Sequence, residues 1–480
     1  MSQHYDVAVI GAGVTGALIA REMSRYHLRA ALLEQCNDAA QGTTKANSAI
    51  VHAGFDAKPG SRKAAMNVRG NELMEPLCEA LHVPFERNGS LVLGFCEEDR
   101  AHLEQLLEQG RRNGVPGLRI ISKDELLAME PNANPEAVGA LYAPTGGIVN
   151  PYELCIAAAE CAAGNGAEFF RKFRCAAVTW IGNCFEVRSD DDQAVSANVV
   201  INAAGVHADD VARLIGDESF AIHARRGEYL LLDNTQAGVV RHTVFQCPSP
   251  MGKGVLITPT VHGNVLVGPT AEDIDDKTDL ATTATGLQSI QEIIARSVPG
   301  YRIRDVVTSF TGLRAVDSRG DFILEHSAAN PRMIHAAGIE SPGLTAAPAI
   351  AEYIAALALA ALGGAEQKEN WNPGRQKPVR IKELGPEELR AAIAENPAYG
   401  RVVCRCETVS EGEILDAIHA PAGARDIDGV KRRTRAGMGR CQGGFCGARV
   451  LEILARELHL PLEEITKFGG ESNILLTRTK

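Results

Sequence analysis

The sequence lacks the features that would take a protein to nucleic acid or into a membrane. Its 60 acidic residues outnumber its 49 lysines and arginines, and the formal net charge of −11 argues against general affinity for nucleic acid. We found no internal repeat and no low-complexity segment. The most membrane-like stretch, Ala346–Ala365, contains Pro348, Glu352 and Tyr353. We therefore expect a buried helix there and no direct membrane span, which leaves peripheral association through a partner open.

The sequence also lacks a cationic leader, since residues 1–20 begin with an expected strand. Eight of the twelve cysteines are scattered without a pairing pattern, at positions 36, 78, 96, 155, 161, 175, 184 and 247. Reduced thiols of this kind are usual inside cells, so we expect a cytoplasmic protein. A chain of 480 residues with 45% hydrophobic content is expected to form two or three globular domains.

The other four cysteines form a compact motif near the carboxyl end. Cys404 and Cys406 lie in RVVCRCETVS, and Cys441 and Cys446 lie in GMGRCQGGFCGAR. Thiolates are soft ligands that suit an iron–sulfur cluster or a zinc ion. The neighbouring glycines would let backbone N–H groups turn toward metal-bound sulfur. Because C-x2-C spacing is more usual for zinc, we favour the cluster; zinc and four ordinary thiols are the alternatives.

A glycine-rich turn near the amino terminus predicts a bound dinucleotide. Gly11, Gly13 and Gly16 are spaced G-x-G-x-x-G between an expected strand and an expected helix, and Glu34 ends the next expected strand. These glycines permit the tight turn, the approach of backbone to a pyrophosphate and close helix–strand packing, in that order. Glu34 would accept hydrogen bonds from ribose hydroxyls. The alternative is an α/β turn that binds no nucleotide.

Later segments favour FAD over NAD, because polar side chains and small residues could receive a ribityl chain and a flat ring. No cysteine or tyrosine stands in an evident attachment motif, so we expect FAD to be held without a covalent bond. The residues expected to contact it are Thr43, Thr44, Asn47 and Ser48 in GTTKANSAIVHAG, Ala204 and Gly205 in VVINAAG, and Gly338, Gly343, Leu344 and Thr345 in IHAAGIESPGLTAA.

With these motifs, residues 5–365 resemble the glycine oxidase/D-amino-acid oxidase superfamily of FAD enzymes. KANSAIVHAG is most similar to the branch that holds FAD-dependent glycerol-3-phosphate dehydrogenases and L-2-hydroxyglutarate oxidases. Residues 400–470 resemble the 2Fe–2S domain of bacterioferritin-associated ferredoxin. This fusion is similar to the catalytic subunit of anaerobic glycerol-3-phosphate dehydrogenases. The resemblance implies two cofactors, FAD and a 2Fe–2S cluster, and an oxidoreductase acting on CH–OH donors.

We therefore expect an α/β fold with three parts. A Rossmann-like FAD-binding domain carries an inserted antiparallel, β-rich substrate domain within residues 1–365, and a polar linker leads to a small α-rich iron–sulfur domain. The expected bounds are 1–80, 151–215 and 316–365 for the FAD-binding parts, 85–150 and 220–315 for the substrate domain, 366–400 for the linker and 401–480 for the iron–sulfur domain.

The candidate substrate residues are His52, Arg314 and Lys253. In the resembling dehydrogenases a histidine at the VHAGFD motif lies near the flavin, where a neutral imidazole could take a hydroxyl proton. Arg314 offers a planar fork suited to phosphate or carboxylate, and Lys253 adds positive charge. The structural alternatives are packing of His52 against the flavin, a salt bridge from Arg314 to Asp317, and solvent exposure of Lys253.

These residues predict the oxidation of a small anionic secondary alcohol, first sn-glycerol 3-phosphate to dihydroxyacetone phosphate. The alternatives are L-2-hydroxyglutarate or another 2-hydroxy acid, an amine or amino acid, and a non-catalytic flavin/iron–sulfur electron-transfer subunit or redox sensor. Electrons would pass through FAD and the cluster to a second redox subunit. A basic run, Lys431–Arg435, is expected as a solvated helix face, as positive potential beside an anionic cluster, or as a dock for an acidic redox partner.

Overall fold

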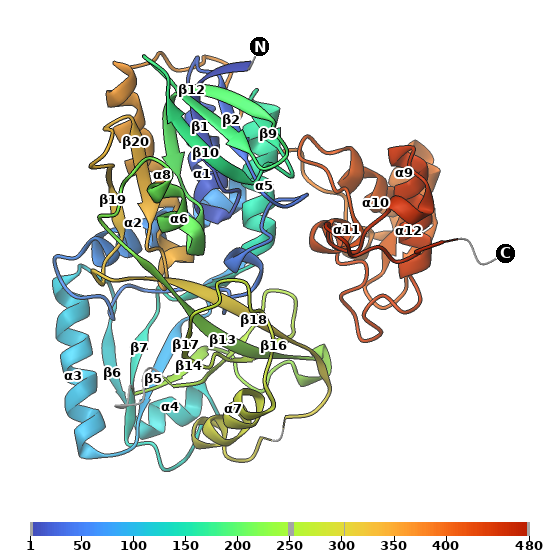
Figure 1. Ribbon diagram of the computed structural model, residues 1–480. Helices are drawn as coiled ribbons and strands as arrows, with labels where there is room; N and C mark the ends of the chain where they lie inside the picture. The colour runs from blue at the N-terminus through green and yellow to red at the C-terminus, as the bar shows by residue number, and fades with distance from the viewer. Residues whose placement is uncertain (1–2, 248–253, 302, 478–480) are drawn as a thin grey trace.

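A computed structural model of the chain describes residues 3–247, 254–301 and 303–477. Figure 1 shows a sheet with covering helices, a second sheet beneath it, and a small helical domain to one side. This arrangement confirms the predicted fold class, an α/β FAD-binding fold with a β-rich second domain and an α-rich carboxyl-terminal domain.

The first sheet has eight strands, and its central strands are parallel. Their carboxyl ends therefore meet at one edge, which is where ligands bind in open α/β sheets. The strands are β1 (Gln3–Ile10), β2 (Ala30–Leu33), β9 (Glu168–Phe170), β10 (Cys175–Trp180), β11 (Phe185–Ser189), β12 (Ala194–Asn202), β19 (Ile323–His326) and β20 (Met333–Ala337).

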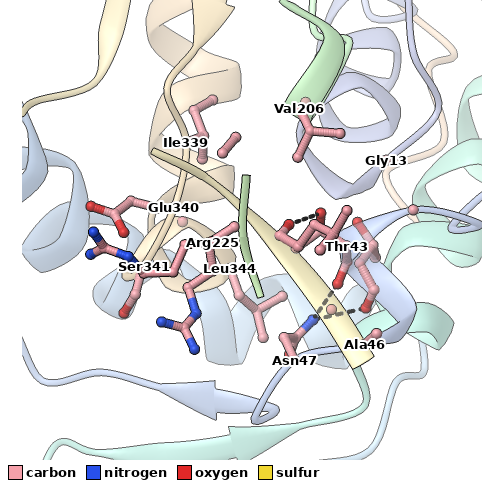
Figure 2. Close-up of a pocket in the computed structure, with 18 of the residues that line it drawn as sticks. Gly13, Thr43, Ala46, Asn47, Val206, Arg225, Ile339, Glu340, Ser341 and Leu344 are labelled. Carbon is pink, nitrogen blue, oxygen red and sulfur yellow. Dashed lines mark hydrogen bonds between the residues drawn. The ribbon is translucent and has the colours of Figure 1, made fainter. Parts of the chain in front are cut away.

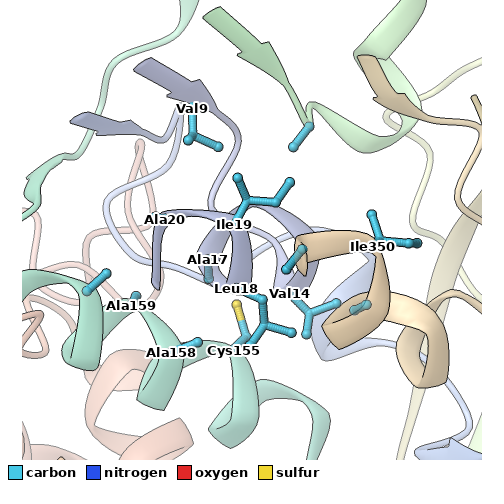
Figure 3. Packing of buried hydrophobic residues seen from close by; sticks show 14 of the residues in the cluster. Val9, Val14, Ala17, Leu18, Ile19, Ala20, Cys155, Ala158, Ala159 and Ile350 are labelled. Carbon is cyan, nitrogen blue, oxygen red and sulfur yellow. The ribbon is translucent and has the colours of Figure 1, made fainter. Parts of the chain in front are cut away.

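Four helices cover this sheet and form the largest core with it: α1 (Val14–Met23), α2 (Arg62–Ala80), α5 (Pro151–Gly164) and α8 (Gly343–Leu362). Figure 3 shows Ala17 and Leu18 of α1 beside Cys155 and Ala158 of α5. Small side chains let these helices approach closely. Within the described ranges α8 alone is long and apolar enough to span a membrane, yet it packs on α1 and α2, and 56% of its apolar window is buried. The expected buried helix is confirmed.

The second sheet has nine strands and joins two separated segments of the chain, because β14 pairs in parallel with β5. The strands are β5 (Ser90–Gly94), β6 (Arg119–Ser122), β7 (Gly139–Ala143), β13 (Ile222–Leu232), β14 (Thr243–Gln246), β15 (Leu256–Pro259), β16 (Val265–Gly268), β17 (Glu272–Ile274) and β18 (Val306–Asp317). The helices that accompany it are α3 (Glu97–Arg112), α4 (Lys123–Met129) and α7 (Ala284–Ser297).

Short elements complete the chain. Near the domain junction lie β3 (Ile50–Val51), β4 (Phe85–Glu86), β8 (Gly147–Val149), the 3₁₀ turns η1 (Thr43–Lys45) and η2 (Gly205–His207), and α6 (Ala208–Arg213). The carboxyl-terminal region holds α9 (Pro386–Glu395), β21 (Val402–Cys404), β22 (Val409–Ser410), α10 (Glu411–His419), α11 (Ile427–Thr434) and α12 (Gly447–Leu458).

The polar segment 366–400, expected as a linker, lies along the FAD-binding domain. Trp371 stacks its indole against Arg21 and Arg25, with both guanidinium carbons 5.1 Å from the ring centroid. Arg375 forms a largely buried ion pair with Glu160 of α5 at 2.7 Å. The segment therefore fixes the direction in which the chain enters the carboxyl-terminal domain.

Candidate functional site

One large cavity, of about 1490 Å³, lies between the carboxyl edge of the first sheet and the second sheet. Figure 2 shows Gly13 and Val206 at one end, Thr43, Ala46 and Asn47 along one side, and Glu340, Ser341 and Leu344 opposite. Of the residues expected to hold the cofactor, the structure gathers most on its wall: Gly11, Gly13, Glu34, Thr43, Thr44, Asn47, Ser48, Ala204, Gly205, Gly343 and Leu344.

The glycine-rich turn fits a pyrophosphate. Gly11 has φ +102°, and a Cβ there would stand 2.5 Å from the Ala203 carbonyl oxygen. Helix α1 begins at Val14, whose N–H donates to Thr44 Oγ1, and the N-cap residue Gly13 has no side chain to occupy the space in front of the next N–H groups. A helix amino terminus with exposed N–H groups and a positive dipole end is a ready site for an anion.

Glu34 follows β2 and holds this turn by hydrogen bonds. Its Oε2 accepts a hydrogen bond from the Ala12 N–H at 2.8 Å, and its Oε1 accepts one from the Cys36 N–H at 2.9 Å. Burial raises the pKa of Glu34, and the N–H groups of Cys36 and Ala12 oppose that effect. Each carboxylate oxygen accepts more than one hydrogen bond, so both can still receive ribose hydroxyls.

Replacing Glu34 with alanine is expected to weaken FAD binding about tenfold to a hundredfold, because hydrogen bonds to a charged acceptor contribute roughly 1.5–3 kcal/mol. Glu34→Gln keeps the size of the side chain but replaces one acceptor oxygen with an NH₂ group, which would face the N–H of Ala12 or of Cys36. It should therefore weaken FAD binding as well. Fluorescence titration of apoprotein with FAD measures both. Unchanged affinity in Glu34→Ala would remove Glu34 from the binding site.

The loop after Gly42 uses its side chains to fix its own shape. Asn47 Nδ2 donates to the Thr44 carbonyl oxygen at 2.8 Å, and Thr43 Oγ1 donates to the Leu313 carbonyl oxygen at 2.5 Å. Thr44 Oγ1 accepts the Val14 N–H at 3.0 Å, so this hydroxyl also lies at the helix terminus. The loop thereby places a rigid wall against the cavity, and η1 within it packs on α5.

Three expected cofactor residues lie outside the cavity lining. Gly16 lies where a Cβ would stand 1.9 Å from the Gly11 carbonyl oxygen, so it serves close helix–strand packing. Gly338 occupies a turn with φ +65° against Asp317. Thr345 is buried, and its Oγ1 accepts the His52 N–H at 2.8 Å. The candidate Lys253 lies outside the described residues.

His52 stands on the cavity wall with its backbone held on both sides. Thr345 accepts its N–H, and Asn67 and Asn71 of α2 both donate to its carbonyl oxygen, at 3.1 and 3.0 Å. Its Nε2 lies 3.5 Å from Ser341 Oγ, and its ring lies 6.0 Å from that of Phe245. The imidazole therefore projects from a fixed backbone toward the cavity.

Arg314 lines the same cavity from β18 and donates from Nη2 to the Thr270 carbonyl oxygen at 2.6 Å. Asp317, its expected alternative partner, instead accepts the Arg319 N–H at 2.9 Å. Sequence reasoning missed Arg225, which is the register partner of Arg314 across the antiparallel β13–β18 pair and also lines the cavity. Asp273 binds the Arg225 guanidinium at 2.6 and 2.9 Å.

The four cysteines of the carboxyl-terminal domain form two pairs. Cys406 Sγ and Cys441 Sγ are 3.7 Å apart, and the Cys404 and Cys446 thiols are close enough for each to shift the pKa of the other. A separation near 3.7 Å is the edge of a tetrahedron with metal–sulfur bonds of about 2.3 Å. In the part of the chain that the structure describes, no three His, Cys, Asp or Glu side chains converge on one metal ion. Two thiolate pairs fit a two-iron cluster better than one zinc ion.

Nearby backbone N–H groups lower the pKa of Cys404 and of Cys441. Phe445 and Gly443 donate to Cys441 and lower its pKa. The neighbouring Cys446 thiol lowers the pKa of Cys404 to about 6, and Cys404 in turn raises the pKa of Cys446. A cluster ligand must be deprotonated, and one cysteine of each pair, Cys404 and Cys441, has a lowered pKa, whereas its partner, Cys446 or Cys406, has a raised one. The inner pair, Cys404 and Cys446, is buried, whereas Cys406 is exposed.

The basic run before Cys441 does not form a solvated face. Arg432 and Arg433 are 6% and 9% exposed, and both bind Asp38 of the FAD-binding domain. Arg433 contacts both Asp38 oxygens at 2.8 Å, and Arg432 Nη2 contacts Oδ2 at 2.7 Å. Arg435 is paired with Glu407 at 2.7 Å. The expectation that these arginines dock a partner is therefore wrong, because their charges bind within the chain.

The loop that carries Cys441 also rests on the two other domains. Tyr152, at the start of α5, donates from its hydroxyl to Met438 Sδ at 3.3 Å. Arg440 binds Asp233 at the end of β13 at 2.9 Å, and this hydrogen bond lowers the pKa of Asp233 to about 2. The cluster loop thus contacts helix α5 of the FAD-binding domain and the end of β13 in the second sheet.

Fold, cavity and paired thiolates together define a flavin-binding oxidoreductase with an appended iron–sulfur domain. Residues 6–357 match the family of FAD dependent oxidoreductases, and residues 402–456 match the BFD-like [2Fe-2S] binding domain. The chain belongs to the FAD dependent oxidoreductase family, and its cofactors are FAD and a 2Fe–2S cluster.

Several named proteins are similar to this chain. The glycerol 3-phosphate dehydrogenase of Caloramator mitchellensis is 48% identical over 99% of both chains. The glycerol 3-phosphate oxidase of Mycoplasma genitalium is 31% identical and covers 77% of this chain and 98% of its own. The structure of the dithionite-reduced L-α-glycerophosphate oxidase of Mycoplasma pneumoniae with FAD bound superposes with a TM-score of 0.74 at 31% identity, covering 78% of this chain and 98% of its own.

Proposed function

We propose that this protein oxidises sn-glycerol 3-phosphate to dihydroxyacetone phosphate. The observation that carries the proposal is the cross-strand arginine pair at the cavity wall. Like charges directly opposite each other in a sheet are destabilising unless an anion lies between or beside them. Asp273 neutralises Arg225, whereas Arg314 contacts a neutral carbonyl group. A phosphate held by Arg314 would complete the charge balance and suit its planar fork.

His52 supplies the second part of the proposal. We assign it the role of general base, which takes the proton of the substrate hydroxyl. FAD, when bound, accepts the hydride from the same carbon. The fixed backbone of His52 limits where its ring can lie, and the wall built by residues 43–48 closes the other side of the cavity. The relatives named for glycerol 3-phosphate support the choice of substrate.

The expected result is anaerobic bleaching of the flavin by sn-glycerol 3-phosphate, at a rate well above that with L-2-hydroxyglutarate or amino acids. Arg314→Lys keeps the charge but loses the bidentate fork, so it should raise KM with FAD content unchanged. If a 2-hydroxy acid or an amine bleached the flavin and sn-glycerol 3-phosphate did not, the proposed substrate would be wrong. A flavin that no small molecule bleaches would indicate a redox sensor.

We further propose that electrons leave one at a time through the cluster to a second redox protein. The support is the unequal exposure of the cluster site: Cys404 and Cys446 are buried, whereas Cys406 is exposed, as is Phe445 of the cluster loop at 91%. We place the protein in the cytoplasm, which agrees with twelve cysteines that form no disulfide in the described part of the chain.

Substrate should reduce the flavin and then the cluster, which rapid-freeze EPR can follow in the protein itself. Wild type should contain about two irons per chain, as one 2Fe–2S cluster requires. The variant Cys441→Ser, Cys446→Ser should lose the iron yet keep flavin bleaching, and Cys96→Ser, an exposed thiol outside the motif, serves as the control. A cluster that stays oxidised while the flavin is reduced would contradict the route.

A further inference from the structure

One irregular segment, residues 34–45, contacts both the cofactor cavity and the iron–sulfur domain. Its two ends, residues 34–36 and 41–45, line the cavity. Its middle, residues 37–40, lies outside the cavity lining and is buried. Residues 34–42 belong to no helix or strand, so contacts with neighbouring parts of the protein must hold their shape. The segment therefore has one side toward the flavin site and one toward the iron–sulfur domain.

This segment holds the phosphate-binding turn in place. Glu34 accepts the Ala12 N–H, and the Ala40 N–H donates to the Ala12 carbonyl oxygen at 3.0 Å. Both polar backbone groups of Ala12 are therefore bonded to the segment. Ala40 has φ +61°, a left-handed conformation that is strained in a residue with a Cβ atom. The contacts on both sides of the segment have to maintain this conformation, because it is unfavourable in a free chain.

The middle of the same segment binds the iron–sulfur domain. Asp38 binds two arginines of α11, and Asn37 Nδ2 donates to Asp426 Oδ2 at 2.6 Å, at the amino-terminal cap of that helix. Gln41, which lines the cavity, donates from Nε2 to Asn37 Oδ1 at 3.4 Å. A continuous line of hydrogen bonds thus leads from the cavity wall through Gln41 and Asn37 to the start of α11.

We propose that the binding of FAD and the docking of the iron–sulfur domain are coupled through residues 34–45. An irregular segment loses conformational entropy when it becomes ordered. A partner that orders the segment from one side reduces the entropy that the other partner must overcome, so each binds more tightly when the other is present. The iron–sulfur domain therefore docks more firmly on a chain that holds its flavin than on one that has lost it.

The first experiment removes FAD from the wild-type protein and measures hydrogen exchange in α11, which lies outside the cavity lining. Flavin is stripped with potassium bromide at neutral pH, and visible circular dichroism shows that the cluster is retained. Exchange of α11 amides reports local opening. It should be about fivefold or more faster without FAD, the lower end of typical coupling between sites. Helix α12, which packs within the iron–sulfur domain, is the control and should exchange alike in both states.

The second experiment weakens docking and measures FAD affinity. The double variant Arg432→Ala, Arg433→Ala removes the contacts to Asp38 without changing any residue of the segment or of the cavity lining. Coupling between two binding events is reciprocal, so FAD affinity should also fall about fivefold or more. Arg440→Ala, which removes the exposed pair with Asp233, is the matched control and should bind FAD like the wild type. Fluorescence titration of the apoproteins measures all three affinities.

Either of two results would overturn the coupling: wild-type FAD affinity in the folded double variant, or equal exchange of α11 with and without FAD. An equal loss of FAD affinity in Arg440→Ala would also overturn it, because the effect would then be general destabilisation. If the double variant does not fold, hydrogen exchange of the wild type decides. Neither measurement uses a substrate, so the outcome is independent of the proposed oxidation of sn-glycerol 3-phosphate.

Discussion

His52→Ala is expected to slow reduction of the flavin by substrate about 10²–10⁴-fold, which is the usual cost of losing a general base. FAD content should not change, since the contacts of the cofactor wall come from other residues. Stopped-flow absorbance under anaerobic conditions measures the reduction step directly. His52→Gln keeps a side chain of similar reach and should remain slow.

His207→Ala is the control for this change. His207 lines the same cavity, but it lies at the end of η2 and its Nδ1 is paired with Asp210 at 3.1 Å. We expect substrate to reduce the flavin of His207→Ala at close to the wild-type rate. If His52→Ala were also reduced normally, the role of His52 would be packing against Phe245.

Asp38→Asn is expected to weaken docking of the iron–sulfur domain by about 3–5 kcal/mol, because it removes the nearest counter-charge of two buried arginines, which keep only longer ion pairs with Asp426 and Glu160. Asp38 is fully buried and accepts three hydrogen bonds from Arg432 and Arg433. Urea unfolding, followed by flavin fluorescence and by visible circular dichroism of the cluster, should show the domain separating at lower denaturant. Limited proteolysis within residues 366–400 reports the same event.

Asp233→Asn is the matched control at the same interface. Its partner Arg440 has a side chain that is 69% exposed, and exposed ion pairs contribute about 0–1 kcal/mol. A double-mutant cycle with Arg433→Ala isolates the coupling of Asp38. Equal effects of the Asp38 and Asp233 substitutions would show that the buried pair does not hold the domain.

The contribution of Asp38 should not vary between pH 5 and 8. Burial alone would raise the pKa of Asp38, but Arg433 and then Arg432 outweigh it and hold the pKa well below its usual range. A carboxylate with a depressed pKa stabilises fully above its unfolded value, near 4, and loses that effect only as the pH falls through the folded value. Domain separation in acid should therefore start only below about pH 4.

Most of the elements of the fold could be predicted from local sequence patterns. The apolar runs EYLLLD, GVLITPT and NVLVGPT became strands β13, β15 and β16, and the glycine-rich turn lies between β1 and α1. Such elements follow from periodicity and from turn chemistry within about ten residues. The metal-binding role of the four cysteines could also be predicted from the sequence, because soft ligands gathered in one short motif have few other uses.

Pairings between distant segments could not be read in this way. Arg225 and Arg314 become neighbours only through the register of β13 on β18, which the sequence of neither strand specifies. Asp38 and Arg433 are 395 positions apart, and a basic helix is usually exposed, so the buried pair gave no local signal. Asn67 is one of several polar residues on an otherwise ordinary helix. The proposed contribution of Lys253 stays a prediction.

The buried cluster at Asp38 makes the interface unequal in its response to damage. Loss of either arginine leaves Asp38 paired with the other one. Loss of the carboxylate leaves Arg432 and Arg433 with only longer ion pairs, to Asp426 and to Glu160. The interface should therefore tolerate the loss of one arginine better than the loss of the acid.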